Sequence, residues 1–306
     1  MAGTTLAIAV LAGARLANAD PFVAAPTGPI LLHLNDDEQI AGANDITGPN
    51  NATPYSAINT AGTEGNWGIV QISSIQTGFV ESPVGSDIQA STPTVFVDGQ
   101  NGGEQILGIF YGVHLDTLGN PSTASGGVLD LYGITGTNQS VGAEVASATN
   151  LTKRTSQSQY TGFTCATNTA NCTFLARLDF VYGANTAADT KTTIVSPVNP
   201  ITTDGTAQSY LSVDTSDPGL WTAALNDNFF TLDPNNNPLP DTPDVRLSNS
   251  FAHGGATAWT IPGTDIIGLL SSDPGRAAPV PEPASLALLG SALLGFGAFA
   301  RRRWRK

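Results

Sequence analysis

The residues best suited to chemistry are five oxygen-bearing side chains in one short polar stretch. They stand at positions 1, 3, 5, 9 and 12 of a twelve-residue segment: Asp233, Asn235, Asn237, Asp241 and Asp244. A hard cation such as Ca²⁺ takes about six to eight oxygen ligands from a compact loop, so this spacing predicts a calcium site. Two departures favour the alternative of a polar loop stiffened by proline. Pro238 stands at position 6, where such a loop needs Gly, and Asp244 has a shorter arm than the Glu expected at position 12.

A second candidate for cation binding is the acidic run Asp36-Asp37-Glu38, for which the alternative is a solvated turn. His114 and Asp116 would share one face of a strand, as a catalytic pair could, and His253 precedes two glycines as in some oxyanion loops. No Gly-x-Ser-x-Gly elbow accompanies His253, so ordinary structural placement of each histidine is favoured.

Carbohydrate chemistry is the other possibility that the residue types raise. Trp67, Trp221 and Trp259 could line a sugar platform, although single tryptophans are more often core residues. The carboxylates are too numerous for a glycosidase pair to be chosen from the sequence. Phosphate-binding loops and dinucleotide fingerprints are absent from the sequence. We therefore expect no catalytic residues, no enzyme activity and no cofactor apart from the candidate Ca²⁺.

These side chains must be positioned by strands. Short β-rich or alternating runs are bounded by Gly, Pro, Asn, Asp or Ser clusters, and they cover residues 30–34, 67–75, 94–97, 106–115, 128–134, 174–182, 210–213 and 245–247. No sustained helical stripe occurs between residues 20 and 278. The sequence therefore predicts an all-β ectodomain at residues 20–278, an antiparallel β-sandwich of the jelly-roll or Ig-like kind. A parallel β-helix is the alternative, but no fixed-period repeat supports it.

The chain contains two cysteines, Cys165 and Cys172, separated by six small or polar residues. This spacing suits a disulfide across a short loop in an oxidising compartment. Such a bridge would stabilise the fold by roughly 2–3 kcal/mol.

The N-terminal segment has the features of an export signal. Residues 6–14 are apolar, and Ala17-Asn18-Ala19 has the small-x-small form of a signal-peptidase site. We therefore expect a signal peptide at residues 1–19 with cleavage after Ala19. The usual basic residue before the apolar core is missing, which predicts that the natural chain starts further upstream.

The C-terminal segment, residues 279–306, combines three elements in order. Pro281, Glu282 and Pro283 come first, and an uncharged apolar run of 17 residues follows at 284–300. At about 1.5 Å per residue this run is near the minimum length for a transmembrane helix. A basic tail ends the chain: Arg301, Arg302, Arg303, Arg305 and Lys306. Positive charge beside a membrane helix favours the cytoplasmic side, so the large N-terminal part should lie outside.

Together these elements resemble the PEP-CTERM sorting signal of exported bacterial proteins. The resemblance implies recognition of Pro281, Glu282 and Pro283 by exosortase, a membrane-embedded cysteine transpeptidase, with cleavage near the motif. It also implies that the protein comes from bacteria that make exopolysaccharide. The paired segments at residues 102–112 and 126–132 are similar to segments of uncharacterised PEP-CTERM ectodomains, which imply no activity.

Charge limits the partners of the exported region. All acidic residues except Glu282 lie between residues 20 and 280, whereas only six of the twelve basic residues do, which leaves 24 acids and a net charge near −18. Nucleic acid and anionic lipid would be repelled. Signal peptidase, exosortase, the inner membrane in transit and extracellular polysaccharide remain as expected partners. We expect a structural cell-surface or matrix protein associated with exopolysaccharide and biofilm, and the alternative is a secreted carbohydrate-binding module or glycan-active hydrolase.

Overall fold

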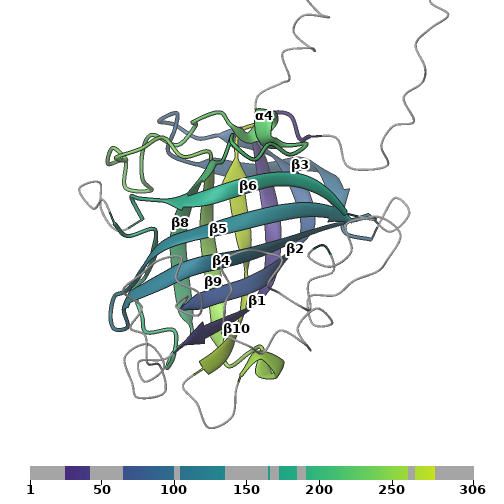
Figure 1. The fold of residues 1–306 in the computed structure, drawn as a ribbon. Helices are drawn as coiled ribbons and strands as arrows, with labels where there is room; N and C mark the ends of the chain where they lie inside the picture. Colours follow the sequence, from purple (N-terminus) through teal and green to yellow (C-terminus); the bar gives the residue numbers. More distant parts are fainter. Residues whose placement is uncertain are drawn as a thin grey trace, which may run out of the picture.

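The structure is a computed structural model that describes residues 25–41, 65–99, 104–134, 165, 172–184, 191–260 and 266–279. Its strands all belong to one antiparallel sheet (Figure 1). They are β1 (Ile30–Ala41), β2 (Asn66–Val80), β3 (Ile88–Val97), β4 (Gln105–Thr117), β5 (Ser122–Ile134), β6 (Cys172–Val181), β7 (Ile194–Ser196), β8 (Gly205–Val213), β9 (Val245–His253) and β10 (Ile266–Ala277). Two short helical turns, α4 (Thr222–Leu225) and η3 (Thr257–Trp259), lie between strands.

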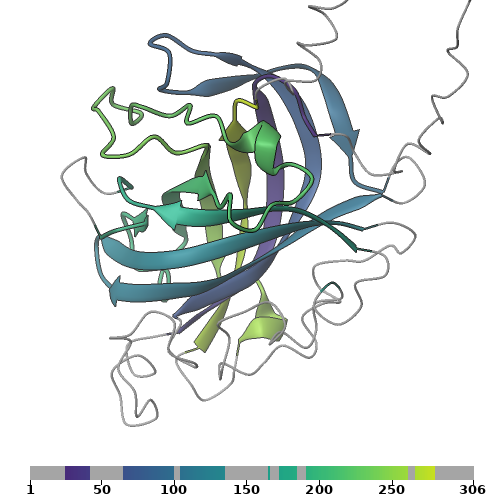
Figure 2. The ribbon, with the colours of Figure 1, turned by 45° about the horizontal axis from the view of Figure 1, so that its top comes forward.

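The sheet closes on itself. Its strands follow the order β1-β10-β9-β8-β6-β5-β4-β2, and β2 pairs again with β1. The closing pair runs from Ile30 opposite Thr77 to Ile40 opposite Asn66. On its other side β1 pairs with β10 along its whole length, from Ile30 opposite Ala277 to Ala41 opposite Ile266. Figure 2 shows the strands surrounding a common interior, and we call this arrangement the closed sheet.

Two short or divergent strands complete the closed sheet. The first half of β2 pairs with β4, and its second half pairs with β3 where β4 has diverged. The three-residue strand β7 pairs with the start of β5 and with β8, beyond the point where β6 and β8 stop pairing. Every neighbouring pair is antiparallel. Along each strand the side chains alternate between the interior and the outer face.

The main hydrophobic core fills the interior. Every second residue of a strand contributes to it. Examples are Ile30, Leu32 and Leu34 of β1 and Leu129 and Leu131 of β5. A second buried cluster lies on the outer face, where Trp67 of β2 packs against Trp259 of η3 with ring centroids 4.7 Å apart. Burial on both faces explains the nearly continuous apolar run of β4.

The all-β antiparallel prediction is confirmed, and each predicted strand overlaps an observed one. The prediction of two separate packed sheets is wrong, because β1 pairs on both sides and joins what would have been two sheets. Strand periodicity shows which residues face inward but does not show which strands are neighbours. The strands β7 and β10 were not predicted; β10 contains Ser-Ser-Asp-Pro-Gly, which has the composition of a turn.

The two ends of the described domain meet. The backbone N–H of Gly28, just before β1, donates to the carbonyl oxygen of Pro279, just after β10, at 2.8 Å. We call this the terminal end of the closed sheet. The predicted signal peptide at 1–19 and the predicted transmembrane helix at 284–300 lie outside the described residues. Within the part of the chain that the structure describes, no helix is long and apolar enough to cross a membrane.

Candidate functional site

The strongest candidate site is an internal cavity at the end of the closed sheet opposite the terminal end. Its volume is about 90 Å³. The β1 residues that line it lie between Leu34 and Ile40, and the β10 residues come from the first half of that strand. Apolar side chains form most of its wall: Leu34, Ile40, Val70, Phe110, Val113, Leu115, Leu129, Phe180, Leu247, Phe251 and Leu269.

Two carboxylates of β1, Asp36 and Glu38, also line the cavity. Their side chains are on the same face of the strand as Leu34 and Ile40, because side chains two residues apart point the same way. Asp36 is 5% exposed and Glu38 is 8% exposed. The acidic run is therefore part of a strand, and the interpretation of Asp36-Asp37-Glu38 as a solvated turn is wrong. The two-residue periodicity from Leu32 through Ile40 was the signal that could have revealed this.

Neutral groups hold these carboxylates in place. The hydroxyl of Ser271 on β10 donates to Oε1 of Glu38 at 2.8 Å, and the side-chain amide of Asn66 on β2 donates to Oε2 at 2.8 Å. Burial raises the pKa of Asp36 well above its usual range, and the neighbouring charge of Glu38 adds to this effect. Burial likewise raises the pKa of Glu38. The arrangement can hold a proton on the pair, or it can receive a positive charge from outside the chain.

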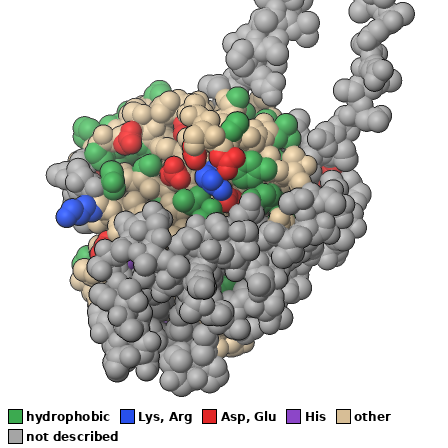
Figure 3. Space-filling model, viewed as in Figure 1, with side chains coloured by type: hydrophobic (Ala, Val, Ile, Leu, Met, Phe, Trp, Pro, Cys, Tyr) green, Lys and Arg blue, Asp and Glu red, His purple; other side chains and the backbone are tan. Residues whose placement is uncertain are grey.

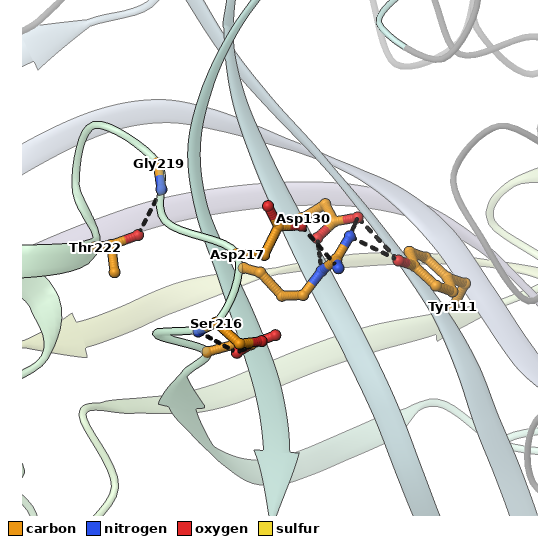
Figure 4. A network of polar contacts seen from close by, with 8 residues as sticks. Tyr111, Asp130, Ser216, Asp217, Gly219 and Thr222 are labelled. Carbon is orange, nitrogen blue, oxygen red and sulfur yellow. Dashed lines mark hydrogen bonds and ion pairs between the residues drawn. The ribbon is translucent and has the colours of Figure 1, made fainter.

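A second polar cluster lies on the outer face of the sheet, between β4, β5 and β6 (Figure 4). Nε and one terminal nitrogen of Arg177 donate to the two carboxylate oxygens of Asp130, at 2.7 and 3.0 Å. The hydroxyl of Tyr111 donates to the same carboxylate at 2.9 Å. The other terminal nitrogen of Arg177 forms an ion pair with Asp217 at 2.9 Å. This cluster attaches the segment before α4 to the sheet, and its groups are mutually satisfied.

The residues predicted to bind calcium fall into separate environments. Oδ1 of Asp233 accepts the backbone N–H groups of Asn235 and Asn237 at 2.8 and 2.7 Å, which makes a local turn. Asp241 is exposed and accepts the N–H of Thr242. Asp244 is 1% exposed and binds the N–H groups of other segments. Among the described residues, no group of three or more His, Cys, Asp or Glu side chains could hold a metal ion. Calcium binding by this loop stays a prediction.

Asp227 is an unusually weak acid because it is partly buried beside Asp244. Its backbone N–H donates to Oδ1 of Asp244 at 2.8 Å. Burial, and then the charge of Asp244, raise the pKa of Asp227 to about 7. Because the folded state keeps this proton at pH values where the unfolded chain releases it, stability is lost as pH rises from the ordinary carboxyl range to about 7.

We expect this effect to be measurable with Asp227→Asn. The asparagine variant should lack the part of the pH dependence due to Asp227, on the order of 1–2 kcal/mol after allowance for solvent screening. Urea unfolding of both proteins at pH 5 and 8 measures it, and the difference between them removes the opposite contribution of His114, whose pKa burial lowers. Equal pH dependence in both proteins would contradict the prediction.

The remaining candidates are two histidines and three tryptophans, which the structure places as follows. His114 lies 3.5 Å from Asp116, as their shared strand face predicted, and the hydroxyl of Ser125 also donates to Asp116. A ring nitrogen of His253 lies 3.2 Å from the carbonyl oxygen of Pro200. The three tryptophans proposed for a sugar platform are at most 1% exposed: Trp67, Trp221 and Trp259. They therefore cannot form a platform on the surface.

The predicted disulfide between Cys165 and Cys172 is confirmed, with a Cα–Cα distance of 5.6 Å. The signal-cleavage residues Ala17 and Ala19, the motif Pro281–Pro283 and the basic tail lie outside the described residues. Figure 3 shows acidic side chains outnumbering basic ones on the described surface of one face, in keeping with the excess of acids in the sequence.

The comparisons with known proteins bear on the C-terminal segment. Residues 279–303 match the model of the PEP-CTERM protein-sorting motif. The motif marks the chain as an exported protein sorted by exosortase, and this confirms the resemblance noted in the sequence. No curated protein and no solved structure matches the chain. The match begins two residues after the end of β10, at the terminal end of the closed sheet.

Proposed function

We propose that the chain is a non-enzymatic cell-surface or matrix protein that associates with extracellular polysaccharide after exosortase processing. The observation that carries this proposal is the position of the sorting motif, which begins directly where the last strand of the domain ends. Residue 284, the first of the apolar run, lies only five residues beyond Pro279. Since an extended residue spans at most about 3.6 Å, the domain must lie close to the membrane before processing.

The terminal end of the closed sheet suits that position. The backbone N–H of Gly78 donates to the carbonyl oxygen of Pro29, which places this part of the chain beside the terminal end. Phe79 is the next residue. Phe79 is 53% exposed and Val84, in the turn after β2, is 74% exposed. Exposed apolar side chains are tolerated at a membrane interface, where aromatic rings are enriched. We propose that this end faces the membrane while the segment 284–300 anchors the chain.

The alternative of a glycan-active hydrolase rests on one observation, the pair of buried carboxylates Asp36 and Glu38. Pockets that take drug-sized ligands have volumes of about 300–1,000 Å³. The cavity beside these carboxylates has about 90 Å³, which favours a smaller occupant than a sugar chain. We therefore propose that polysaccharide is bound on the outer surface and is not cleaved.

The proposal is tested by removing residues 279–306 and, separately, by changing Glu282→Ala in the native host. We expect both variants to be lost from the cell surface and from the polysaccharide fraction of the matrix, measured by immunoblot of fractionated cultures. A conservative change of an exposed residue on β3, Val95→Ala, is the control and should leave the distribution unchanged. If the protein without residues 279–306 still reaches the surface, the sorting role is wrong.

Polysaccharide association has its own readout in the same cultures. The processed wild-type protein should be released when the extracellular polysaccharide is digested or its synthesis is blocked. A wild-type protein that remains in the matrix fraction under both treatments would contradict the polysaccharide role and leave sorting unaffected.

A further inference from the structure

The internal cavity contains acidic groups, and none of the described residues that line it is basic. Asp36 and Glu38 are the charged side chains among the described residues that line it, and these residues include no Lys, Arg or His. The donors that reach Glu38, Ser271 and Asn66, are neutral and cannot cancel its charge.

Two other carboxylates that are withdrawn from solvent lie against arginine. Asp130 is held by the guanidinium of Arg177. Asp87 lies 3.2 Å from Arg246 and 3.0 Å from Arg276. An uncompensated buried charge costs several kcal/mol, so the two carboxylates in the cavity require a proton or a cation.

The cavity wall also contains acceptors with no donor. The amide oxygens of Asn66 and Asn249 are buried and have no hydrogen-bond partner. These oxygens and the two carboxylates come from different strands: β1, β2 and β9. A complementary occupant must therefore carry positive charge and several hydrogen-bond donors, as an ammonium group does.

The apolar wall distinguishes an organic cation from a metal ion. Ca²⁺ needs about six to eight oxygens around it. Most of this wall is instead hydrocarbon, including Val70, Phe110 and Leu129. At about 10–15 Å³ for each water-sized site, 90 Å³ holds a molecule of a few non-hydrogen atoms.

We propose that this cavity is a binding site for a small alkylammonium ion, with its charged head between Asp36 and Glu38 and its alkyl chain against the apolar wall. The occupant compensates one of the two negative charges, and a proton held by the pair compensates the other. Its ammonium group donates to the amide oxygens, while the hydrocarbon wall buries its chain. The site lies at the end of the closed sheet away from the sorting motif. It is therefore independent of sorting and of polysaccharide association.

The test is calorimetric titration of the full chain, purified in non-ionic detergent and kept in cacodylate buffer at pH 7.0, which contains no amine and does not precipitate calcium. The three probes are butylammonium chloride, 1-butanol and calcium chloride. Butylammonium should bind at least ten times more tightly than 1-butanol, which has the same chain length and no charge. Equal binding of the two, absence of butylammonium binding, or binding of calcium in its place would each overturn the proposal.

Matched variants locate the binding. Asp36→Asn and Glu38→Gln keep the size of each side chain and should each weaken butylammonium binding at least tenfold. The control is Asp37→Asn, which lies between them on β1 and faces away from the cavity, and it should bind as the wild type does. Unchanged affinity in both cavity variants would contradict the assignment. The comparison of butylammonium with 1-butanol needs only the wild-type chain, so it stands even if a variant does not fold.

Discussion

Replacing Arg177 by alanine is expected to lower the free energy of unfolding by about 3–5 kcal/mol. The reason is the charge left behind, because Asp130 is 0% exposed and, among the described side chains, would keep only the Tyr111 hydroxyl as a partner. Breaking a buried ion pair by removing one partner has a cost of this size. Urea unfolding of the processed protein measures it, with one common slope of free energy against urea concentration used to fit all variants.

Two further variants separate the buried charge from the rest of the cluster. Asp217 pairs with the same guanidinium but is 49% exposed, so Asp217→Ala should cost less than about 1 kcal/mol. Adding Asp130→Asn to Arg177→Ala removes the uncompensated charge and should recover part of the lost stability. If the double variant were no more stable than Arg177→Ala, loss of packing by the arginine stem would be the better explanation.

The second large effect is expected for Asp244→Ala. The carboxylate of Asp244 accepts the backbone N–H of Val213 at 2.7 Å, of Asp227 at 2.8 Å and of Asn228 at 2.6 Å. Each buried donor left without a partner costs about 1–3 kcal/mol, so we expect a loss of roughly 3 kcal/mol or more. Urea unfolding at pH 7 measures the change.

Asp241→Ala is the matched control, because Asp241 belongs to the same predicted calcium loop but is exposed. Its replacement should change stability by no more than about 0.5 kcal/mol. Similar losses for the two variants would mean that the loop acts as one unit, as a filled cation site would. Asp244→Asn should in addition lower the pKa of Asp227, since the charge of Asp244 contributes to raising it.

The strands of this protein were predictable because alternation and turn residues report local backbone geometry. The run from Ile106 to Leu115 was correctly assigned to a strand, and the apolar character of both its faces agrees with its burial on both sides. The closure of the sheet was not predictable, because nothing in β1 or β2 shows that their free edges meet. Likewise β10 carries Asp273-Pro274-Gly275, which indicates a turn. The strand stays extended there because β1 pairs with it through these residues, while its pairing with β9 passes from Ser272 to Gly275.

The candidate site was also found only in part, because the sequence does not show which strands are neighbours. The acidic run Asp36–Glu38 was noted as a candidate for cation binding. Which of its carboxylates point inward and which point outward becomes clear only when β1 is known to extend through the run. Asp130 is the single charged residue of β5, and Arg177 is the single basic residue of β6, a pattern that could have indicated a buried pair. Asp244 was assigned to a ligand set by spacing alone, whereas the fold uses it to bind backbone groups of two other segments.

The pairing of β1 with β10 joins the first strand of the chain to the last. During export the N-terminal strands cross the membrane early, but the closed sheet cannot form until β10 has followed them. β10 ends two residues before the sorting motif, so its emergence coincides with arrival of the motif at the membrane. Long-range pairing of this kind is slow to form because the intervening chain must first be ordered. Completion of the fold is thus timed to the end of translocation, and exosortase would meet a domain that has only just closed.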